Sequence, residues 1–403
     1  MPADGHDRRA WTELLALTAA FAMSQAFRTV AAVMATPLQA EFGLSAQALG
    51  LFAGAFHFAF GAMQLFMGVG IDLHGLRRTV LTAFPLAVAG ALLSAAATGF
   101  GVLVAGQVLI GIGCAPAFLV CTVFIARRFP PRHFAAVSGL ILGLGGIGML
   151  LTGTPLAWLI GAWSWRAGFL ALAVGAALAW GLVALQVREP PLPPGPRGSL
   201  REAVAGFGAL LRLPHTWGIV ALGAVTYASF LSLRGLWLGP LLTGRHGLSL
   251  MASGHVLLAA SLLSLAGPPL FGRLDPGPTR RRRWIVGWTL GLALLLAALA
   301  PGWGRWTDAG LALAASLVSG FMVLQYADVR VAYPPAMTGR AMAVFTMALF
   351  LGVALMQWLT GLAASHAPAA GLEPFTAALL LMAALLAAGA GAFVRLPQPP
   401  PAA

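Results

Sequence analysis

One short loop decides the fold: from Gly68 to Arg78 the chain reads GVGIDLHGLRR. It joins two apolar stretches, so we interpret it as the connection between two membrane-crossing helices. Gly68 allows close helix contact, Asp72 can face the positive N-terminus of a neighbouring helix, and Gly75 suits a tight turn. The pair Arg77 and Arg78 would hold the loop at charged lipid headgroups. We expect these five residues to form a gating loop.

The composition around this loop places the chain in a membrane. Of its 403 residues, 59% are hydrophobic and 9% are charged, and the mean hydropathy is +0.87. Soluble domains are about 45–50% apolar and about 25% charged. Twelve crossings of roughly 20–25 residues each would use roughly 240–300 positions and leave no room for a large soluble domain.

Breaks at glycine, proline and charge clusters divide the chain into twelve apolar stretches. We predict spans at residues 11–36, 46–71, 79–98, 101–126, 135–160, 166–187, 214–240, 250–272, 284–301, 308–331, 340–363 and 374–394. The sequence thus predicts an all-α polytopic membrane protein of twelve transmembrane helices. Its expected parts are an N-terminal six-helix bundle at 1–187, a Pro-rich cytoplasmic central loop at 188–213, a C-terminal six-helix bundle at 214–394 and a C-terminal tail at 395–403.

The charge distribution predicts the orientation. Nineteen arginines fall in connections on the side of both termini, and three, Arg166, Arg245 and Arg305, fall on the other side. By the positive-inside rule, both termini are expected in the cytoplasm, in a bacterial inner membrane. The run at residues 280–283 is then interpreted as a topology anchor at lipid headgroups, and the net charge of +13 does not indicate a nucleic-acid partner.

The residue types present disfavour an enzyme. All 24 basic residues are arginine, so the chain lacks the lysine that a P-loop places on nucleotide phosphates. Cysteine and histidine show no clustered metal-ligand spacing, and serine, histidine and aspartate form no recognisable nucleophile motif. We expect no cofactor and no metal.

The two halves repeat each other at a shift of about 204 positions. The turn that begins at Gly43 and reads GLS matches the GLS turn at Gly247, and Gly148 falls on Gly352. Internal repeats of this kind build carriers in which two bundles rock about a site near the bilayer midplane. We therefore expect the two bundles to be related by a pseudo-two-fold axis.

The loop from Gly68 to Arg78 resembles the signature loop of the major facilitator superfamily, with a glycine, an acid four residues later, a second glycine and paired basic residues. The resemblance departs at Leu73 and Leu76, where the family usually has basic residues. It implies a secondary transporter that works as a monomer by alternating access. It does not imply a substrate, because one fold hosts many functions.

Two arginines lie well inside predicted spans, away from the span ends, where a charge costs about 2.5–3.5 kcal/mol. Arg28 in the first span and Arg234 in the seventh occupy nearly equivalent positions of the repeat. Facing each other across a central cavity, they would offer two guanidinium groups to a carboxylate, phosphate or sulfonate, and such a pair resembles the organic-anion carriers of the superfamily. Alternatively, each arginine alone could extend to the outer headgroups.

Other polar residues in the spans could complete the substrate site. These are Gln25, Tyr227, Trp237, Gln107, Gln325, Tyr326 and Gln357; helix-to-helix hydrogen bonds explain the amides about as well. His57 in the second span titrates in a range that suits proton coupling, or it could be a core histidine bonded to a carbonyl. Asp328 could also carry the proton, with an ion pair at a helix end as the alternative.

We therefore expect a proton-coupled transporter of a small organic anion. The alternatives are an exporter of an amphipathic compound, such as a siderophore, a vitamin-like heterocycle or a drug, and a ligand sensor or scaffold that transports nothing.

Overall fold

The computed structural model describes the chain except residues 1–3, 131–132, 190–207, 398 and 400–403. Most of the predicted central loop therefore lies outside the described residues. In the first half the helices are α1 (Asp4–Thr29), α2 (Ala31–Phe42), α3 (Ala46–His74), α4 (Leu76–Ala95), α5 (Phe100–Cys114), α6 (Ala117–Arg128), α7 (Phe134–Leu151), α8 (Thr154–Ala162) and α9 (Trp165–Gln186).

The second half begins with α11 (Pro214–Ser232) and three short segments, η2 (Leu233–Trp237), α12 (Leu238–Pro240) and η3 (Leu241–Arg245). It continues with α13 (Leu250–Arg273), α14 (Pro278–Leu299), α15 (Arg305–Val318), η4 (Ser319–Phe321), α16 (Met322–Ala332), α17 (Pro335–His366), η5 (Ala367–Ala370) and α18 (Pro374–Arg395). Eleven helices within the described residues are long and apolar enough to cross a membrane, and a bent pair makes twelve. The predicted all-helical fold is confirmed.

The bent pair is the first span, where α1 and α2 meet at 46°. Thr29 ends α1, and its hydroxyl donates back to the carbonyls of Gln25 and Ala26 and lies 2.6 Å from the hydroxyl of Thr152. Back-bonding of this kind bends helices. The seventh span is irregular in another way, because η2 and η3 are π-helical turns of five residues each.

The ninth span begins earlier than predicted. Helix α14 starts at Pro278, directly after Gly277 with φ +84°, and so contains the arginine run at residues 280–283. Proline at the first helical position loses no hydrogen bond, because that N–H has no helical partner. Arg281 Nη2 then lies 2.7 Å from Asp275 Oδ2. Hydrogen bonds from the guanidinium lower the pKa of the Asp275 carboxyl and keep it ionised.

The repeated GLS turn is built the same way in both halves. Gly43 and Gly247 have φ values of +62° and +63°, and the following Ser45 and Ser249 each accept a hydrogen bond from the N–H three residues later. A left-handed glycine that ends one helix and a serine that caps the next make a compact corner. The repeat in the sequence thus corresponds to a repeat in the structure.

A second repeated feature has its charges exchanged. In the first half, Glu41 accepts from Arg166 at 2.6 Å, and in the second half Arg245 binds Glu373. Glu41 and Arg245 are 204 positions apart, so equivalent helix ends carry opposite charges. Each pair ties the end of the first span of its half to the start of the last.

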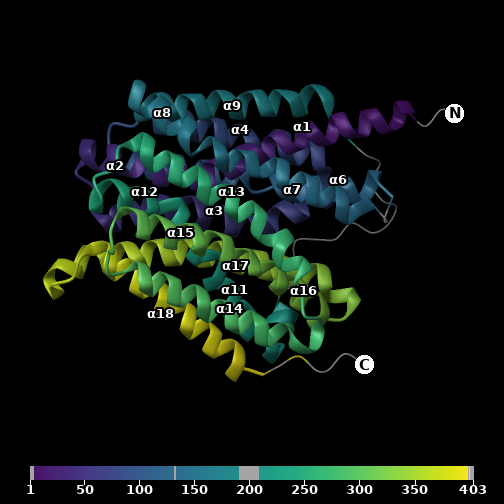
Figure 1. The fold of residues 1–403 in the computed structure, drawn as a ribbon. Helices are drawn as coiled ribbons and strands as arrows, with labels where there is room; N and C mark the ends of the chain where they lie inside the picture. Colours follow the sequence, from purple (N-terminus) through teal and green to yellow (C-terminus); the bar gives the residue numbers. More distant parts are fainter. Residues whose placement is uncertain (1–3, 131–132, 190–207, 398, 400–403) are drawn as a thin grey trace.

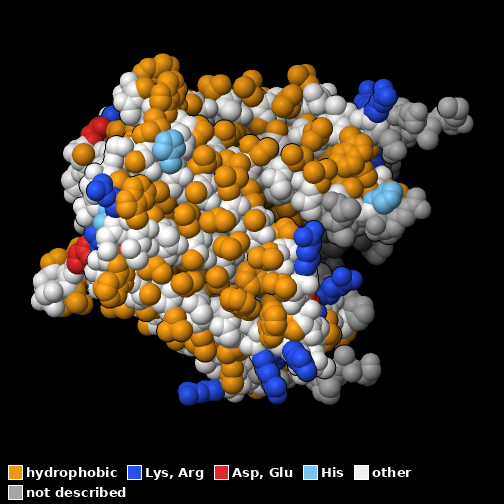
Figure 2. Space-filling model, viewed as in Figure 1, with side chains coloured by type: hydrophobic (Ala, Val, Ile, Leu, Met, Phe, Trp, Pro, Cys, Tyr) orange, Lys and Arg blue, Asp and Glu red, His pale blue; other side chains and the backbone are white. Residues whose placement is uncertain are grey.

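The two halves lie side by side in Figure 1, with the first half purple to blue and the second half teal to yellow. We call the end where α1 begins and α18 ends the arginine-rich end. On the face shown in Figure 2, hydrophobic side chains cover the middle and arginines gather at that end. At the other end Trp163, Trp303 and Trp306 are exposed, as expected where a membrane meets water.

The halves are pressed together at the end opposite the arginine-rich end, which we call the closed end. There α2 packs on α12, and a Cβ at Gly239 would collide with the carbonyl of Ala32. The backbone N–H of Gln47 donates to Ser365 Oγ at 2.8 Å across the same boundary. The largest interface between the halves is that of α3 with α17.

Candidate functional site

Arg28 lies at the junction of the two halves, in the last turn of α1. Its side chain is buried, and its Cζ atom is 4.6 Å from the ring centre of Phe60 on α3 and 4.7 Å from that of Phe350 on α17. The two rings are 4.4 Å apart and contact each other. A cation over aromatic faces is stabilised by their quadrupoles, so both halves contribute to holding this guanidinium.

The Arg28 guanidinium has no hydrogen-bond acceptor or carboxylate partner among the described residues, and its Nε is fully buried without one. The Gln25 side-chain oxygen, one helical turn before it, is also buried and unpaired. Buried polar groups are rarely left unsatisfied, and a buried charge is costly without a counter-charge. The site is therefore suited to an anion that brings its own acceptors.

His57 and Gln357 lie on the same boundary. His57 interacts electrostatically with Arg28, and its side chain faces that of Gln357 across this boundary. The imidazole ring is stacked on the Phe350 ring, with 6.4 Å between the ring centres. Nδ1 is 3.1 Å from the carbonyl of Ala53 and acts as its donor, which leaves Nε2 as a free acceptor. Neither amide atom of Gln357 completes a hydrogen bond within the described residues.

Arg234 is fully buried in η2 on a different boundary. Its Nε donates to Ser261 on α13 at 2.9 Å, and its Nη2 donates to the carbonyl of Met149 on α7 at 3.1 Å. It therefore fastens the second half to the first. The alternative that either arginine extends to lipid headgroups is wrong, because both are buried in protein.

The expectation that Arg28 and Arg234 face each other is not met in this conformation, where they share no partner among the described residues. The pseudo-two-fold axis explains the difference: Arg28 contacts α3 and α17, whereas Arg234 contacts α13 and α7. These are equivalent boundaries on opposite sides of the axis. The sequence repeat gives the equivalence of two positions but not the directions of their side chains.

Tyr227 and Trp237 make different contacts. The ring of Tyr227 is 5.5 Å from that of Phe350 and edge-on to it, so Tyr227 belongs to the aromatic group around Arg28. Trp237 is buried, and its Nε1–H donates to Thr360 Oγ1 at 2.9 Å.

Gln107 is buried on α5 with Nε2 unpaired, but no contact joins it to Arg28.

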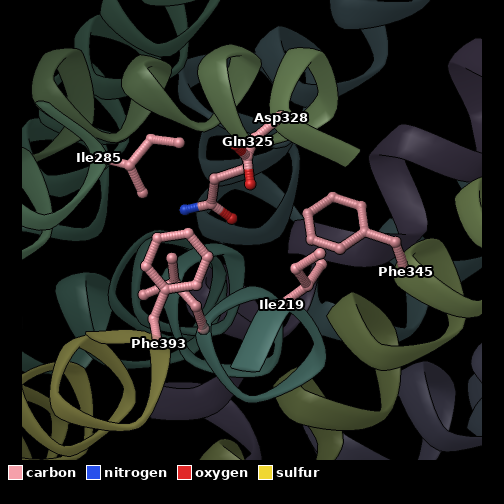
Figure 3. Close-up of a pocket in the computed structure, with 7 residues that line it drawn as sticks. Ile219, Ile285, Gln325, Asp328, Phe345 and Phe393 are labelled. Carbon is pink, nitrogen blue, oxygen red and sulfur yellow. The ribbon is translucent and has the colours of Figure 1, made fainter. Parts of the chain in front are cut away.

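Gln325 faces the interior of the second bundle. Its Oε1 accepts from Thr226 at 3.0 Å, and its Nε2 has no partner among the described residues. Figure 3 shows this amide in a small space bordered by Ile219 and Ile285, which has a volume of about 10 Å³. That volume holds about one water molecule, not a substrate.

Asp328 lines the same small space and lies 3.2 Å from Arg282 Nε. The structure therefore agrees with the alternative in which Asp328 forms an ion pair at a helix end. Any role in carrying a proton would require this pair to open.

The opposite face of α16 borders a cavity of about 570 Å³, which we call the vestibule. Its lining consists of Arg281, Val323, Tyr326, Ala327, Arg330, Val331 and Met342. Tyr326 packs edge-on against Phe345 at 5.1 Å and lies within electrostatic range of Tyr227 and Arg28. The vestibule thus lies at the arginine-rich end, and one of its lining residues, Tyr326, interacts electrostatically with Arg28.

An acid that sequence analysis did not assign holds the loop that follows α3. Glu189, just past α9, accepts from the backbone N–H groups of Leu76 and Arg77 at 2.9 and 2.8 Å. These are the first residues of α4, where a negative charge is stabilised by the helix dipole. Its partner is over a hundred positions away, so its only signal in the sequence is an acid beside the end of a span.

The predicted loop residues have separate outcomes. Gly75 makes the turn, with φ +87°. Arg77 donates to a carbonyl at the end of α9 at 2.8 Å, Arg78 is exposed, and the side chain of Asp72 lies outside what the structure describes. The expected close helix contact at Gly68 is wrong here, because a Cβ at this position would meet no atom within 4 Å.

Two helical bundles that are closed against each other at one end, with the vestibule in the second bundle at the other end, make a polytopic membrane protein of the transporter class. A model of the Major Facilitator Superfamily matches residues 16–356. The chain therefore belongs to the Major Facilitator Superfamily and is a transporter of that family.

Relatives of this chain are also transport proteins. Over 309 residues, the chain is 28% identical to an MFS-type efflux pump of Mycolicibacterium smegmatis, covering 73% of this chain and 69% of the pump. Over 138 residues it is 28% identical to the mouse facilitated glucose transporter member 10 of solute carrier family 2, which is 32% of this chain and 24% of that protein. The chain thus matches about a quarter of the glucose transporter.

Solved structures of the same fold exist. The crystal structure of a D-xylose–proton symporter superposes with a TM-score of 0.75 at 16% sequence identity, over 96% of this chain and 97% of the symporter. At this identity the likeness concerns the arrangement of helices.

Proposed function

We propose that this transporter moves a small organic anion, carboxylate-like, across the bacterial inner membrane by alternating access. The observation that carries the proposal is the Arg28 guanidinium, buried where the two halves meet and left without an acceptor in the described protein. Its neighbours His57 and Gln357 also have unpaired polar atoms. A carboxylate would accept from the guanidinium in a charge-assisted hydrogen bond.

Alternating access would use the two ends described above. The positive-inside rule makes the arginine-rich end cytoplasmic, so this conformation faces inward, with both termini in the cytoplasm. Rocking of the bundle at 1–187 against the bundle at 214–394 would open the closed end and bring the two bundles together at the arginine-rich end. The unpaired Arg28 between α3 and α17 supports a site that both bundles share.

Proton symport is the proposed drive, with the transporter acting as a monomer. An anion that enters against a negative interior needs accompanying positive charge. His57 supports this, because its free Nε2 lies beside Arg28 and an added proton there would be stabilised by a bound anion. In this scheme the proton and the substrate occupy neighbouring positions and depend on each other.

An exporter of an amphipathic compound is the second candidate. It is favoured by the largely apolar vestibule and by the identity with the efflux pump over most of the chain.

The test is thermal stabilisation of the purified protein by carboxylates, sulfonates, phosphate esters and neutral or cationic drugs. A ligand at 100 times its Kd adds about 2.7 kcal/mol to stability. We expect stabilisation by a carboxylate in the wild type and in the control Arg340→Ala, and none in Arg28→Ala. Stabilisation only by neutral or cationic compounds, unchanged in Arg28→Ala, would reject the anion site and favour the exporter.

Coupling is tested in liposomes with an imposed pH gradient. His57→Gln should abolish accumulation driven by the gradient and spare exchange of internal for external substrate. Accumulation at the wild-type level in His57→Gln would reject His57 as the proton carrier.

A further inference from the structure

The two faces of α16 border different spaces. Gln325 and Asp328 line the small interior space of the second bundle, whereas Val323, Ala327 and Arg330 line the vestibule. The second set recurs at a spacing of three to four residues, which is one face of a helix. The vestibule is therefore bordered by a continuous stripe of α16 that ends in a charge.

The charge at the end of this stripe is that of Arg330, and it has no counter-charge among the described residues. The Arg330 side chain is exposed and makes no ion pair or hydrogen bond with any described residue. The neighbouring arginines differ, because Arg281 is held by Asp275 at 2.7 Å and Arg282 by Asp328 at 3.2 Å. Of the two arginines that line the vestibule, Arg330 is thus the one free to bind a ligand.

The remaining lining sets the kind of ligand. Val323, Ala327, Val331 and Met342 present an apolar wall, and the volume of about 570 Å³ lies within the range of about 300–1,000 Å³ found for small-molecule pockets. A ligand that fits this lining has one anionic group for Arg330 and an apolar body. Among the lining residues, Tyr326 interacts electrostatically with Arg28.

We propose that the vestibule is a second binding site, for a carboxylate with an aromatic or aliphatic body, in which Arg330 holds the carboxylate. The site rests on the proposed function in one respect: it is the station between Arg28 and the cytoplasm for the transported anion. During export the ligand would bind here before it reaches Arg28, and during import it would bind here after it leaves Arg28.

The probe for the test is 4-benzoylbenzoate, an aryl carboxylate whose ketone inserts into nearby C–H bonds on illumination. The full-length protein is labelled in phosphatidylcholine vesicles, and the modified peptides are identified by mass spectrometry. We expect label within residues 323–342, including Met342, in the wild type. Arg330→Gln should reduce it about fivefold, the equivalent of about 1 kcal/mol for a partly exposed ion pair.

Two variants complete the experiment. Arg283→Gln removes an exposed arginine near the same end that does not line the vestibule, and it should label like the wild type. Arg28→Gln should also retain the label, because the vestibule is a separate site. Unchanged labelling in Arg330→Gln, or loss of the label in Arg28→Gln, would overturn the proposal.

A lipid headgroup is the competing occupant. If phosphatidylglycerol in the vesicles suppressed the label in the wild type and not in Arg330→Gln, the site would be assigned to lipid and the proposal overturned. Labelling requires no flux. An absence of carboxylate transport would therefore reject the proposed function, while the dependence of the label on Arg330 would still support the vestibule site.

Discussion

The hydroxyl oxygens of Thr36 and Thr243 lie 3.0 Å apart, although 207 positions separate the two residues in the chain. Thr36 is near the end of the first span and Thr243 near the end of the seventh, so this contact joins nearly equivalent positions of the two halves. It lies at the closed end, beside the packing of α2 on α12. Any cycle that opens this end must separate these two oxygens.

A double variant, Thr36→Cys with Thr243→Cys, should therefore form a disulfide and lock the closed end. The side-chain atoms are near enough for a bond with modest movement, and the native Cys114 and Cys121 are buried. We expect mass spectrometry to show the cross-link and transport to stop until a reductant is added. The single variants are the controls, and full transport by the cross-linked protein would contradict the role of this contact.

The two buried arginines should respond oppositely to the same change. Arg234→Gln removes hydrogen bonds to Ser261 and to the Met149 carbonyl and should lower the free energy of unfolding by about 1–3 kcal/mol. Arg28→Gln removes a buried charge without a counter-charge, so the stability of the ligand-free protein should stay equal or rise. Chemical unfolding in detergent measures both. A larger loss in Arg28→Gln than in Arg234→Gln would show that this assignment is reversed.

Glu189→Gln should loosen the start of α4. It replaces a carboxylate that accepts from the N–H groups of Leu76 and Arg77, with an expected cost of about 1 kcal/mol at a helix N-terminus. Hydrogen exchange followed by mass spectrometry should show faster exchange in the first turn of α4. Glu373→Gln, which breaks an ion pair at the other end, is the control and should leave that peptide unchanged.

Asp275 should make stability fall in acid. Hydrogen bonds from Arg281 hold the pKa of this carboxyl below its ordinary value, so its contribution is complete above the unfolded-state pKa of about 3.9. It is lost as the pH falls through the lower folded-state pKa. Between pH 5 and 3 the wild type should therefore lose more thermal stability than Asp275→Asn, and equal losses would contradict this contribution.

The sequence predicted features that depend on local chemistry. The GLS turn contains a glycine that adopts a positive φ and a serine that caps the next helix, so both copies formed as the repeat indicated. The number of spans followed from apolar length. The bend after Thr29 and the π-helical turn that carries Arg234 were not predicted, because they depend on contacts with other helices.

The candidate site was only partly accessible to prediction. Arg28, His57 and Gln357 were each selected because a polar group in an apolar span is costly, but their convergence needed the packing of α3 on α17. Phe60 and Phe350 were missed, because an aromatic residue in a span carries no signal that distinguishes it from lipid-facing packing. The separation of Arg28 from Arg234 required the direction of each side chain about the axis.

The exchanged ion pairs, Glu41 with Arg166 and Arg245 with Glu373, constrain how one half could be converted into the other. Changing the sign of either partner alone places two acids or two arginines side by side, and like charges in contact repel. A path between the two arrangements must therefore pass through an uncharged residue at one position or change both at once. The same repulsion would arise in a chimaera that took one partner of a pair from the first half and the other partner from the second. The polarity of each ion pair is therefore specific to its half.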